Sequence, residues 1–293
     1  MTGVVITNQE LGHNEYKIKR FKEEFSKLGV SLEVYKNDGT LSIIKDNNIV
    51  IKLPKYDFVL YLDKDIYLAK ELEKAGYRLF NKPDFIKLCD DKNLTNIACA
   101  NAGIRMPKTI TGPLFYSKEL KEENLTFLDN VIDELGMPMI FKRVYGSLGE
   151  GVYLIHNKEE LIEKYKEHCR QPLQFQEYFP SSQGRSMRVL IMDKEIVGAF
   201  VRFNTEDFRS NFGTSASSKK LENGGKYFEL AHKIANLFNI EYAGIDLLFG
   251  ENDEPVLCEI NSNAFFEEFE KVTGINVAER FAKMVIRKVN ANE

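Results

Sequence analysis

Two apolar strands joined by a polar turn constrain the fold of this chain more than any other feature. They run over Tyr242–Gly250 and Pro255–Asn261, and their apolar composition predicts a hairpin. If the turn is centred on Asn252 and Asp253, Asp246 on the first strand lies directly opposite Glu259 on the second. The chain is therefore expected to place two carboxylates face to face within one sheet.

Three oxygen-bearing side chains then meet on one side of this hairpin. Asn261 follows Glu259 by two residues, and because side chains alternate along a strand, both point to the same face. Facing carboxylates repel, so a sheet is expected to adopt such a pair when a cation lies between them. An all-oxygen site of this kind suits Mg²⁺ or Mn²⁺. The alternative at this point is a solvated strand end in a surface hairpin.

Length and composition bound the class of protein. The 293 residues are enough for two or three packed subdomains. The net charge of −4, with no long basic block, argues against binding to nucleic acid or to membrane surfaces. No signal peptide and no apolar run of membrane-spanning length are visible. The cysteines lie far apart, which indicates reduced thiols in a cytoplasmic protein; they are Cys89, Cys99, Cys169 and Cys258.

The first 88 residues alternate strand and helix patterns, which predicts a mostly parallel sheet with helices packed on it. Within this unit, Leu41–Leu53 is expected to be a hairpin because Asp46-Asn47-Asn48 lies in its middle. The unit has no glycine fingerprint of the dinucleotide-binding type. We therefore expect it to form one wall of a substrate cleft. From Asn81 to Ala102 the chain is predicted to be helical.

A glycine-rich loop between two strands is the second informative stretch. Glycines at positions 146, 149 and 151 leave backbone N–H groups free to approach a ligand, and Lys142 at the base of the loop adds a positive charge. This chemistry suits a triphosphate. The loop is not a P-loop, because a strand rather than a helix follows it. An ordinary flexible turn is the alternative from these residues alone.

Two later segments carry further candidate groups. The strand over Leu173–Pro180 ends at a proline, and its last backbone groups could pair with a purine edge; the alternative is an ordinary strand. The hairpin over Met187–Phe203 carries Arg188 and Arg202 among apolar residues. Buried arginines need an anion, so a phosphate or carboxylate partner is expected, with a structural salt bridge as the alternative.

With these residues in view, the chain resembles the ATP-grasp superfamily, and within it the RimK-like amino-acid ligases. The likeness covers roughly residues 81–293, and it depends on many motifs in the right order rather than on any single one. The motifs are Asp91-Lys92, Pro107-Lys-Thr109, the stretch from Pro138 through Lys142 to Val152, Gln176-Glu-Tyr-Phe179, Asp207-Phe-Arg-Ser-Asn211, Ala243-Gly-Ile-Asp246, Glu259-Ile-Asn261 and Glu270-Lys-Val-Thr-Gly274.

The resemblance implies a combined α/β and α+β architecture, an ATP-grasp fold behind an N-terminal Rossmann-like domain. The implied domains are 1–88, a central ATP-grasp subdomain over 89–180, and a C-terminal subdomain with the metal site over 181–293. It also implies site residues. Two Mg²⁺ ions, for which Mn²⁺ could substitute, would be held by Asp246, Glu259 and Asn261. ATP would be bound by Lys92, Lys142, Gly146, Ser147, Gly149, Gly151, Gln176, Glu177, Tyr178, Ser186, Arg209, Ser210 and Asn211.

Two positions depart from the family pattern. The Glu-x-Asn motif usually continues through a serine into Ser-Pro-Gly, but here Ser262 is followed by Asn263-Ala264-Phe265. Ser186 stands where the family commonly has an acidic residue that helps to hold the nucleotide. The first departure concerns the acceptor side of the site, and the second concerns the nucleotide side.

The expected activity is an ATP-dependent carboxylate–amine ligase that works through an acyl phosphate and releases ADP. Glutamate or another amino acid would supply the amine, and a peptide or small metabolite would supply the carboxylate. Arg202 is the candidate for orienting the acyl phosphate, with Arg188 second. A dipeptide or cell-wall precursor ligase and a non-catalytic ATP-binding module remain alternatives, and a homo-oligomer is left open.

Overall fold

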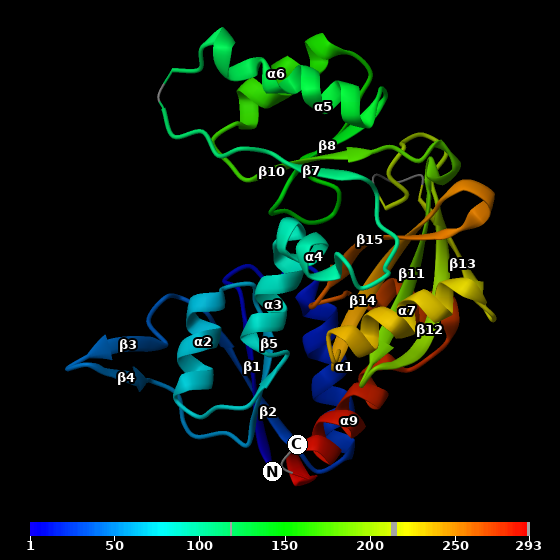
Figure 1. Cartoon of the computed structure of the whole chain (residues 1–293). Coiled ribbons are helices and arrows are strands. Elements are labelled where there is room, and N and C mark those ends of the chain that lie inside the picture. Colours follow the sequence, from blue (N-terminus) through cyan, green and yellow to red (C-terminus); the bar gives the residue numbers. More distant parts are fainter. Residues whose placement is uncertain (118, 212–215, 292–293) are drawn as a thin grey trace.

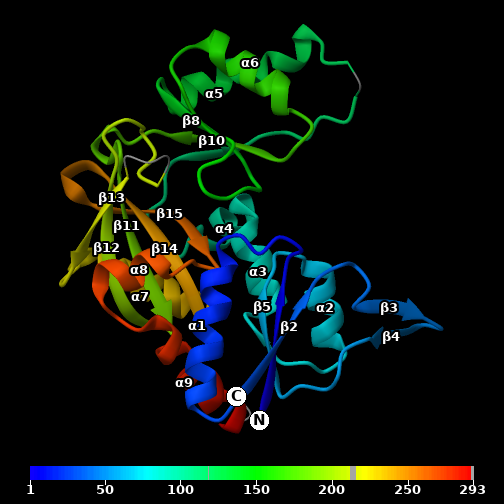
Figure 2. The ribbon, with the colours of Figure 1, turned by 180° about the vertical axis from the view of Figure 1, so that it is seen from behind.

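The computed structural model describes residues 1–117, 119–211 and 216–291. An N-terminal unit and a C-terminal sheet lie side by side, and a middle subdomain lies above them (Figure 1). The view from behind shows the same arrangement, with the start of β1 and the end of α9 close together at the foot of the molecule (Figure 2). No helix among the described residues combines the length and the apolar character that crossing a lipid bilayer requires.

A parallel sheet in the order β2-β1-β5-β6 forms the centre of the N-terminal unit. Its apolar side chains are buried on both faces, as expected for a sheet covered by helices on both sides. Helix α1 covers one face and α2 covers the other, which confirms the predicted arrangement. The elements are β1 (Thr2–Thr7), α1 (Asn14–Lys27), β2 (Ser31–Lys36), β5 (Phe58–Leu62), α2 (Ile66–Lys74) and β6 (Leu79–Phe80).

The predicted hairpin of this unit is present as β3 (Ser42–Lys45) and β4 (Asn48–Ile51). Asp46 and Asn47 in its turn have φ values of 50° and 62°. A two-residue hairpin turn requires this left-handed conformation, and Asp and Asn tolerate it better than other non-glycine residues. The hairpin projects sideways from the unit (Figure 1).

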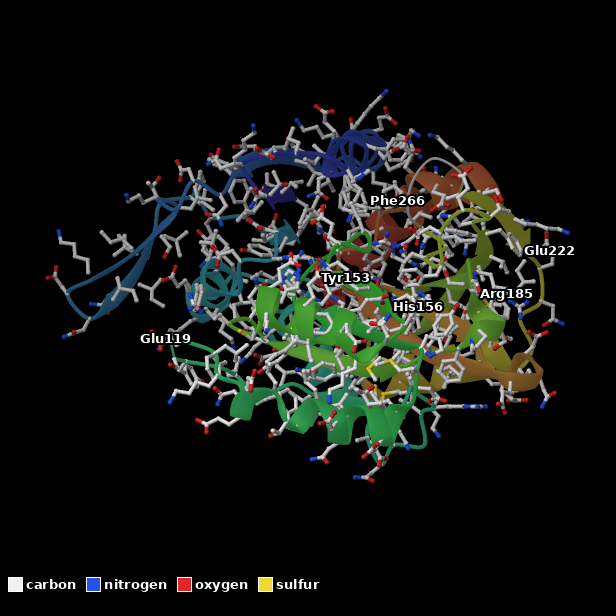
Figure 3. The ribbon with its side chains drawn as sticks, turned by 90° about the horizontal axis from the view of Figure 1, so that it is seen from above. Glu119, Tyr153, His156, Arg185, Glu222 and Phe266 are labelled. Atoms are coloured by element: carbon white, nitrogen blue, oxygen red, sulfur yellow. The ribbon has the colours of Figure 1, made fainter. Side chains whose placement is uncertain are left out.

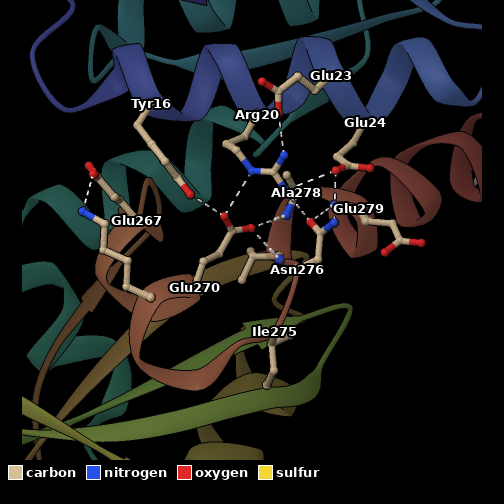
Figure 4. A network of polar contacts seen from close by, with 12 residues as sticks. Tyr16, Arg20, Glu23, Glu24, Glu267, Glu270, Ile275, Asn276, Ala278 and Glu279 are labelled. Atoms are coloured by element: carbon tan, nitrogen blue, oxygen red, sulfur yellow. Dashed lines mark hydrogen bonds and ion pairs between the residues drawn. The ribbon is translucent and has the colours of Figure 1, made fainter.

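The last helix of the chain returns to the N-terminal unit. Helix α9 (Val277–Ala291) packs against α1, and the ring centroids of Phe21 and Phe281 lie 4.9 Å apart. Next to this apolar contact, Nε of Arg20 on α1 donates to Glu270 at 3.2 Å (Figure 4). The N-terminal unit and the C-terminal part therefore share one core.

The middle subdomain is an antiparallel sheet in the order β7-β10-β8-β9, with two helices, α5 and α6, packed on it. Two short helices, α3 and α4, lead into it from the N-terminal unit. In chain order the elements are α3 (Pro83–Asp90), α4 (Lys92–Cys99), β7 (Thr109–Thr111), α5 (Phe127–Leu135), β8 (Met139–Arg143), β9 (Val152–Ile155), α6 (Lys158–His168) and β10 (Leu173–Glu177).

The segment predicted as continuously helical from Asn81 to Ala102 is broken, and the break has a local cause. Asp91 adopts an extended conformation between α3 and α4, and its side chain accepts a hydrogen bond from the N–H of Leu94 at 3.0 Å. An aspartate in this position caps a new helix. The break places Lys92 in the first turn of α4.

The C-terminal part is a five-stranded antiparallel sheet in the order β13-β12-β11-β14-β15. Helix α7 covers one face, and α8 lies on the other, where Phe266, just before α8, meets Phe21 of α1 at a centroid distance of 5.4 Å. Seen from above, Phe266 lies next to the N-terminal part of the chain (Figure 3). The elements are β11 (Arg185–Met192), β12 (Glu195–Phe203), β13 (Ser217–Leu221), α7 (Lys226–Leu237), β14 (Tyr242–Phe249), β15 (Pro255–Asn261) and α8 (Glu267–Thr273); short 3₁₀ turns span Glu122–Leu125, Pro180–Ser182 and Glu251–Asp253.

Candidate active site

The carboxylate pair predicted from the hairpin is confirmed by the register of the sheet. Asp246 on β14 is paired with Glu259 on β15, and the register shifts immediately after Asp246. Asn261 lies on the same face, and its Nδ2 donates to Asp246 Oδ2 at 3.2 Å and to Glu259 Oε1 at 3.1 Å. The three side chains therefore form one cluster.

Two arginines relieve part of the repulsion between the two carboxylates. Arg188 on the neighbouring strand β11 binds both oxygens of Asp246. Nη1 of Arg202 lies 3.7 Å from the same carboxylate, while its Nη2 donates to Glu268 at 2.8 Å. The antiparallel pairing of β11 with β14 places Arg188 opposite Asp246. Both arginines thus have carboxylate partners within the protein.

The two carboxylates differ in their electrostatic surroundings. Burial alone would raise the pKa of Glu259, but Lys92, Asn261, Arg188 and Lys142 together outweigh it and lower that pKa to about 2. Burial raises the pKa of Asp246, and its contacts with Arg188 oppose this rise. Burial lowers the pKa of the Lys92 ammonium, with Glu259 acting in the opposite direction. Glu259 is therefore held ionised at the centre of a cationic shell.

These donor atoms fit a hard cation. Asp246 and Glu259 offer carboxylate oxygens, and Asn261 would offer Oδ1 once its amide turns away from its present orientation. The described part of the chain holds no group of three or more His, Cys, Asp or Glu side chains at metal-binding spacing. A bound Mg²⁺ would therefore need ligands from water and phosphate oxygens, which is its usual preference.

A narrow cavity of about 130 Å³ separates the middle sheet from the C-terminal sheet. Most of the residues predicted to bind nucleotide or metal line it. Arg188 and Asn261 instead line a second cavity next to it, of about 610 Å³. The residues lining the narrow cavity include Lys92, Lys142, Gly146, Ser147, Gly149, Gln176, Glu177, Tyr178, Ser186, Arg202, Arg209, Ser210, Asn211, Asp246 and Glu259.

Side-chain hydrogen bonds from Lys92 and Arg209 hold the glycine-rich loop between β8 and β9 over the narrow cavity. Nζ of Lys92 donates to the carbonyls of Val144 and Gly146 at 3.1 and 3.0 Å. Nη1 of Arg209 donates to the carbonyl of Gly149 at 2.9 Å. The narrow cavity, at about 130 Å³, is smaller than most ligand pockets, which measure roughly 300–1,000 Å³. We therefore expect the loop to lift before a nucleotide enters, releasing Lys92 and Arg209 for its phosphates.

The glycines of this loop differ in what the structure requires of them. Gly146 and Gly149 have φ values of 146° and 79° and line the narrow cavity. Gly151 lines neither of the two cavities. Its φ is 69°, and a Cβ there would lie 2.1 Å from Nε of Arg143. Glycine at position 151 thus has a conformational and steric reason in the fold.

The segment at the end of β10 is tied to the start of the middle sheet. Nε2 of Gln176 donates to Thr109 Oγ1 at 2.8 Å, and the carboxylate of Glu177 accepts from the N–H of Lys108 at 3.1 Å. On the opposite wall, the hydroxyl of Ser186 shares a hydrogen bond of 2.6 Å with Ser210. A serine pair therefore occupies the place where the family commonly has an acidic residue.

The structure adds residues to the site that were not predicted. Glu268 at the start of α8 pairs with Arg202, and Lys17 of α1 lines the larger cavity. A signal for Lys17 exists in the sequence, because it lies at helical spacing on the same face as Ile18 and Phe21, which are buried. A charged residue on an apolar face is a candidate for a specific role. No comparable signal marks Glu268.

Comparison with known proteins defines the class. A model of the RimK-like ATP-grasp domain matches residues 89–285. Beta-citrylglutamate synthase B of Danio rerio is 30% identical over 85% of this chain and 62% of its own length. Tetrahydromethanopterin:alpha-L-glutamate ligase of Methanocaldococcus jannaschii is 25% identical over 73% of this chain and 72% of its length. The crystal structure of a RimK domain ATP-grasp protein from Sphaerobacter thermophilus superposes with a TM-score of 0.71 at 16% identity, covering 97% of this chain and 99% of that one.

The fold is thus the ATP-grasp fold, as the resemblance predicted. The chain belongs to the RimK-like ATP-grasp family, and it is a carbon–nitrogen ligase of the ADP-forming class. Members of this family use ATP, typically with Mg²⁺. The chain spans less than two thirds of the zebrafish synthase, so that enzyme's substrates do not transfer with the match.

Proposed function

We propose that this protein activates a carboxylate with ATP and joins it to the amine of glutamate or another amino acid. The observation that carries the proposal is that the two cavities share one wall, which includes a carboxylate of the hairpin. Glu259, Arg202 and Lys92 line the narrow cavity and the larger one alike. A nucleotide in the first and a carboxylate in the second would meet at this wall. Glutamate as the amine is supported by relatives whose names include a glutamate product or substrate.

The reaction balances without a nucleophile on the protein. An oxygen of the acceptor carboxylate attacks the γ-phosphorus of ATP, and the bond from that phosphorus to the β–γ bridging oxygen breaks to release ADP. The amine nitrogen then attacks the acyl carbon of the resulting acyl phosphate, inorganic phosphate leaves, and the nitrogen loses its proton. What the protein supplies is position and charge.

Each charged side chain has a place in this scheme. Lys142 is 8% exposed on β8 and Lys92 begins α4, so both would neutralise nucleotide phosphates. Arg202, with Arg188 behind it, would orient the acyl phosphate between the cavities. Two Mg²⁺ ions, or Mn²⁺ in their place, would be held by the hairpin cluster and would neutralise charge on the transferring phosphoryl group.

We assign one task to each part of the chain. Residues 1–88 would form the acceptor wall, 89–180 would carry the glycine-rich loop and the adenine segment, and 181–293 would carry the metal hairpin. Glu177 and Tyr178 would bind adenine where the middle and C-terminal parts join.

Product analysis tests the proposal. Purified protein with Mg·ATP is incubated with glutamate and other amino acids, each paired with a panel of peptides and carboxylic acids, and the nucleotide products are separated. We expect ADP and phosphate in amounts equal to the amide formed. Formation of AMP and pyrophosphate instead would establish adenylate chemistry and overturn the acyl-phosphate route.

A further inference from the structure

A buried lysine lines the larger cavity, and the mechanism above does not use it. Lys17 on α1 is 1% exposed, and its ammonium donates to Oδ1 of Asn263. The same nitrogen lies 5.6 Å from the ring centroid of Tyr242 and 5.9 Å from that of Phe265. An ammonium has three donors, and Asn263 is its single hydrogen-bond acceptor within the described part of the chain. The ring of Phe266 lies 6.0 Å away, and three rings at such distances attract an ammonium only weakly. With one neutral hydrogen-bond acceptor and no carboxylate, this buried positive charge is only partly compensated.

The charged groups on the elements around Lys17 are engaged elsewhere. Lys64 after β5 pairs with Asp90 of α3 at 2.5 Å. Glu270 of α8 pairs with Arg20 at 3.2 Å, and Arg188 of β11 pairs with Asp246. On its own side of the cavity, the ring of His13 lies against Phe265 at a centroid distance of 4.9 Å. Among the residues described, none supplies a carboxylate to Lys17.

Asn263 is held so that it presents its oxygen to this lysine. Its Nδ2 donates to the carbonyl of Leu62 at the end of β5, at 3.0 Å. Asn263 also occupies the first position at which the chain departs from the family pattern, where the serine of Ser-Pro-Gly would offer a shorter side chain without an amide. The departure therefore coincides with a contact from Lys17 that crosses between the N-terminal unit and the loop after the metal hairpin.

We propose that Lys17 makes the larger cavity a site for an acceptor with two anionic groups, one of which reacts beside Arg202 while the other is bound by Lys17. This inference rests on the proposed ligase function and names its acceptor class as a polycarboxylate. A second anionic group would meet the donors that Asn263 leaves unused. A monoanionic acceptor would bind beside Arg202 alone and would leave the Lys17 ammonium without an anionic partner. We therefore expect a dianionic acceptor to bind about tenfold or more tightly than a monoanionic one, because it gains one charge-assisted contact.

The ionisation of Lys17 supplies a readout that a purely structural lysine would not give. Burial lowers the pKa of Lys17 to about 7, so at pH 8 it is mostly neutral in the free protein. An anion bound beside the ammonium would raise that pKa. Binding of a dianion at pH 8 should therefore take up close to one proton, and affinity should fall roughly tenfold from pH 8 to pH 9.

Calorimetry on the complex with Mg²⁺ and the ATP analogue AMPPNP tests this at pH 8, in two buffers of different ionisation enthalpy. The probes are matched pairs that differ by one carboxylate: glutarate against pentanoate, and N-acetyl-L-aspartate against N-acetyl-L-2-aminobutyrate. We expect the dianions to bind at least tenfold more tightly, with proton uptake. Lys17→Met should lose both the preference and the uptake. Lys64→Met, in the same cavity but already paired with Asp90, should keep both.

Several results would overturn the inference. These are equal affinity within the pairs, binding of dianions without proton uptake, or an unchanged preference in Lys17→Met. If Lys17→Met does not fold, proton uptake by the wild type decides. Failure of all dianions to bind while Mg·AMPPNP binds would overturn this inference and leave the ligase proposal standing. Failure of Mg·AMPPNP itself to bind would overturn both.

Discussion

Replacing Glu259 by Gln should remove a measurable and pH-dependent part of the stability of the fold. The cationic shell lowers the pKa of this carboxyl from 4.5 to about 2. Each pKa unit corresponds to about 1.4 kcal/mol, so ionised Glu259 contributes about 3 kcal/mol near neutral pH. Because its pKa is lowered in the folded protein, this contribution is complete above about pH 4.5 and is lost as the pH falls toward 2.

Urea unfolding of the wild type and of Glu259→Gln, at pH 7 and at pH 3, measures this difference. We expect the variant to be folded but about 3 kcal/mol less stable at pH 7, with the difference falling to roughly half by pH 3. Glu251→Gln is the matched control, because Glu251 is exposed in the turn of the same hairpin. A difference below about 1 kcal/mol at pH 7, or one that does not depend on pH, would refute the electrostatic reasoning.

The same variant tests the metal site. Mg·AMPPNP at about one hundred times its Kd should stabilise the wild type by about 2.7 kcal/mol through binding to the native state only. Glu259→Gln should lose this stabilisation together with most of its turnover. Near-wild-type turnover of the variant at low Mg²⁺ would mean that the hairpin is no more than a surface turn.

Three further changes test separate parts of the structure. Lys142→Ala should weaken Mg·ATP binding roughly 10- to 150-fold in calorimetry, because it removes a charge-assisted contact. Lys158→Ala is the control and should not weaken binding, because Lys158 is exposed and paired with Asp129. Equal affinities of the two variants would refute a phosphate contact by Lys142. Arg188→Met should lower the free energy of unfolding in urea by about 3–5 kcal/mol, because it leaves Asp246 buried without its partner. Added Mg²⁺ should restore part of this stability. A loss of stability that Mg²⁺ does not reduce would contradict a metal at Asp246. Arg20→Met should lower the free energy of unfolding by about 1–3 kcal/mol, and unchanged stability would mean that its contacts across the shared core are dispensable.

The parts of the site that could be predicted from the sequence are those set by local rules. The pairing of Asp246 with Glu259 follows from period-two alternation around a turn at a known place, and Asn261 follows by the same rule. The hairpin at Asp46 and Asn47 follows from turn chemistry. In each case the deciding residues lie within about twenty positions of one another.

The parts that could not be predicted depend on long-range neighbours. Arg188 meets Asp246 because β11 lies beside β14, and the strand order of an antiparallel sheet is not written in either segment. Strand β13 is a polar edge strand of sequence Ser-Ser-Lys-Lys-Leu, whose composition opposes strand prediction although charged edge strands are common in natural sheets. Helix α8 has seven residues, too few for a clear apolar period.

The packing of α9 on the N-terminal unit also orders the events of biosynthesis. Phe21, Phe25 and Phe58 are synthesised early, yet their core includes Phe281 and Val285, which are synthesised much later. The side of α1 that packs against α9 thus stays uncovered while the intervening residues are made. Nascent chains of this protein carry an exposed aromatic surface until α9 has been made, and a chain cut short before Val277 keeps it. Such a surface is what chaperones recognise, and it favours aggregation.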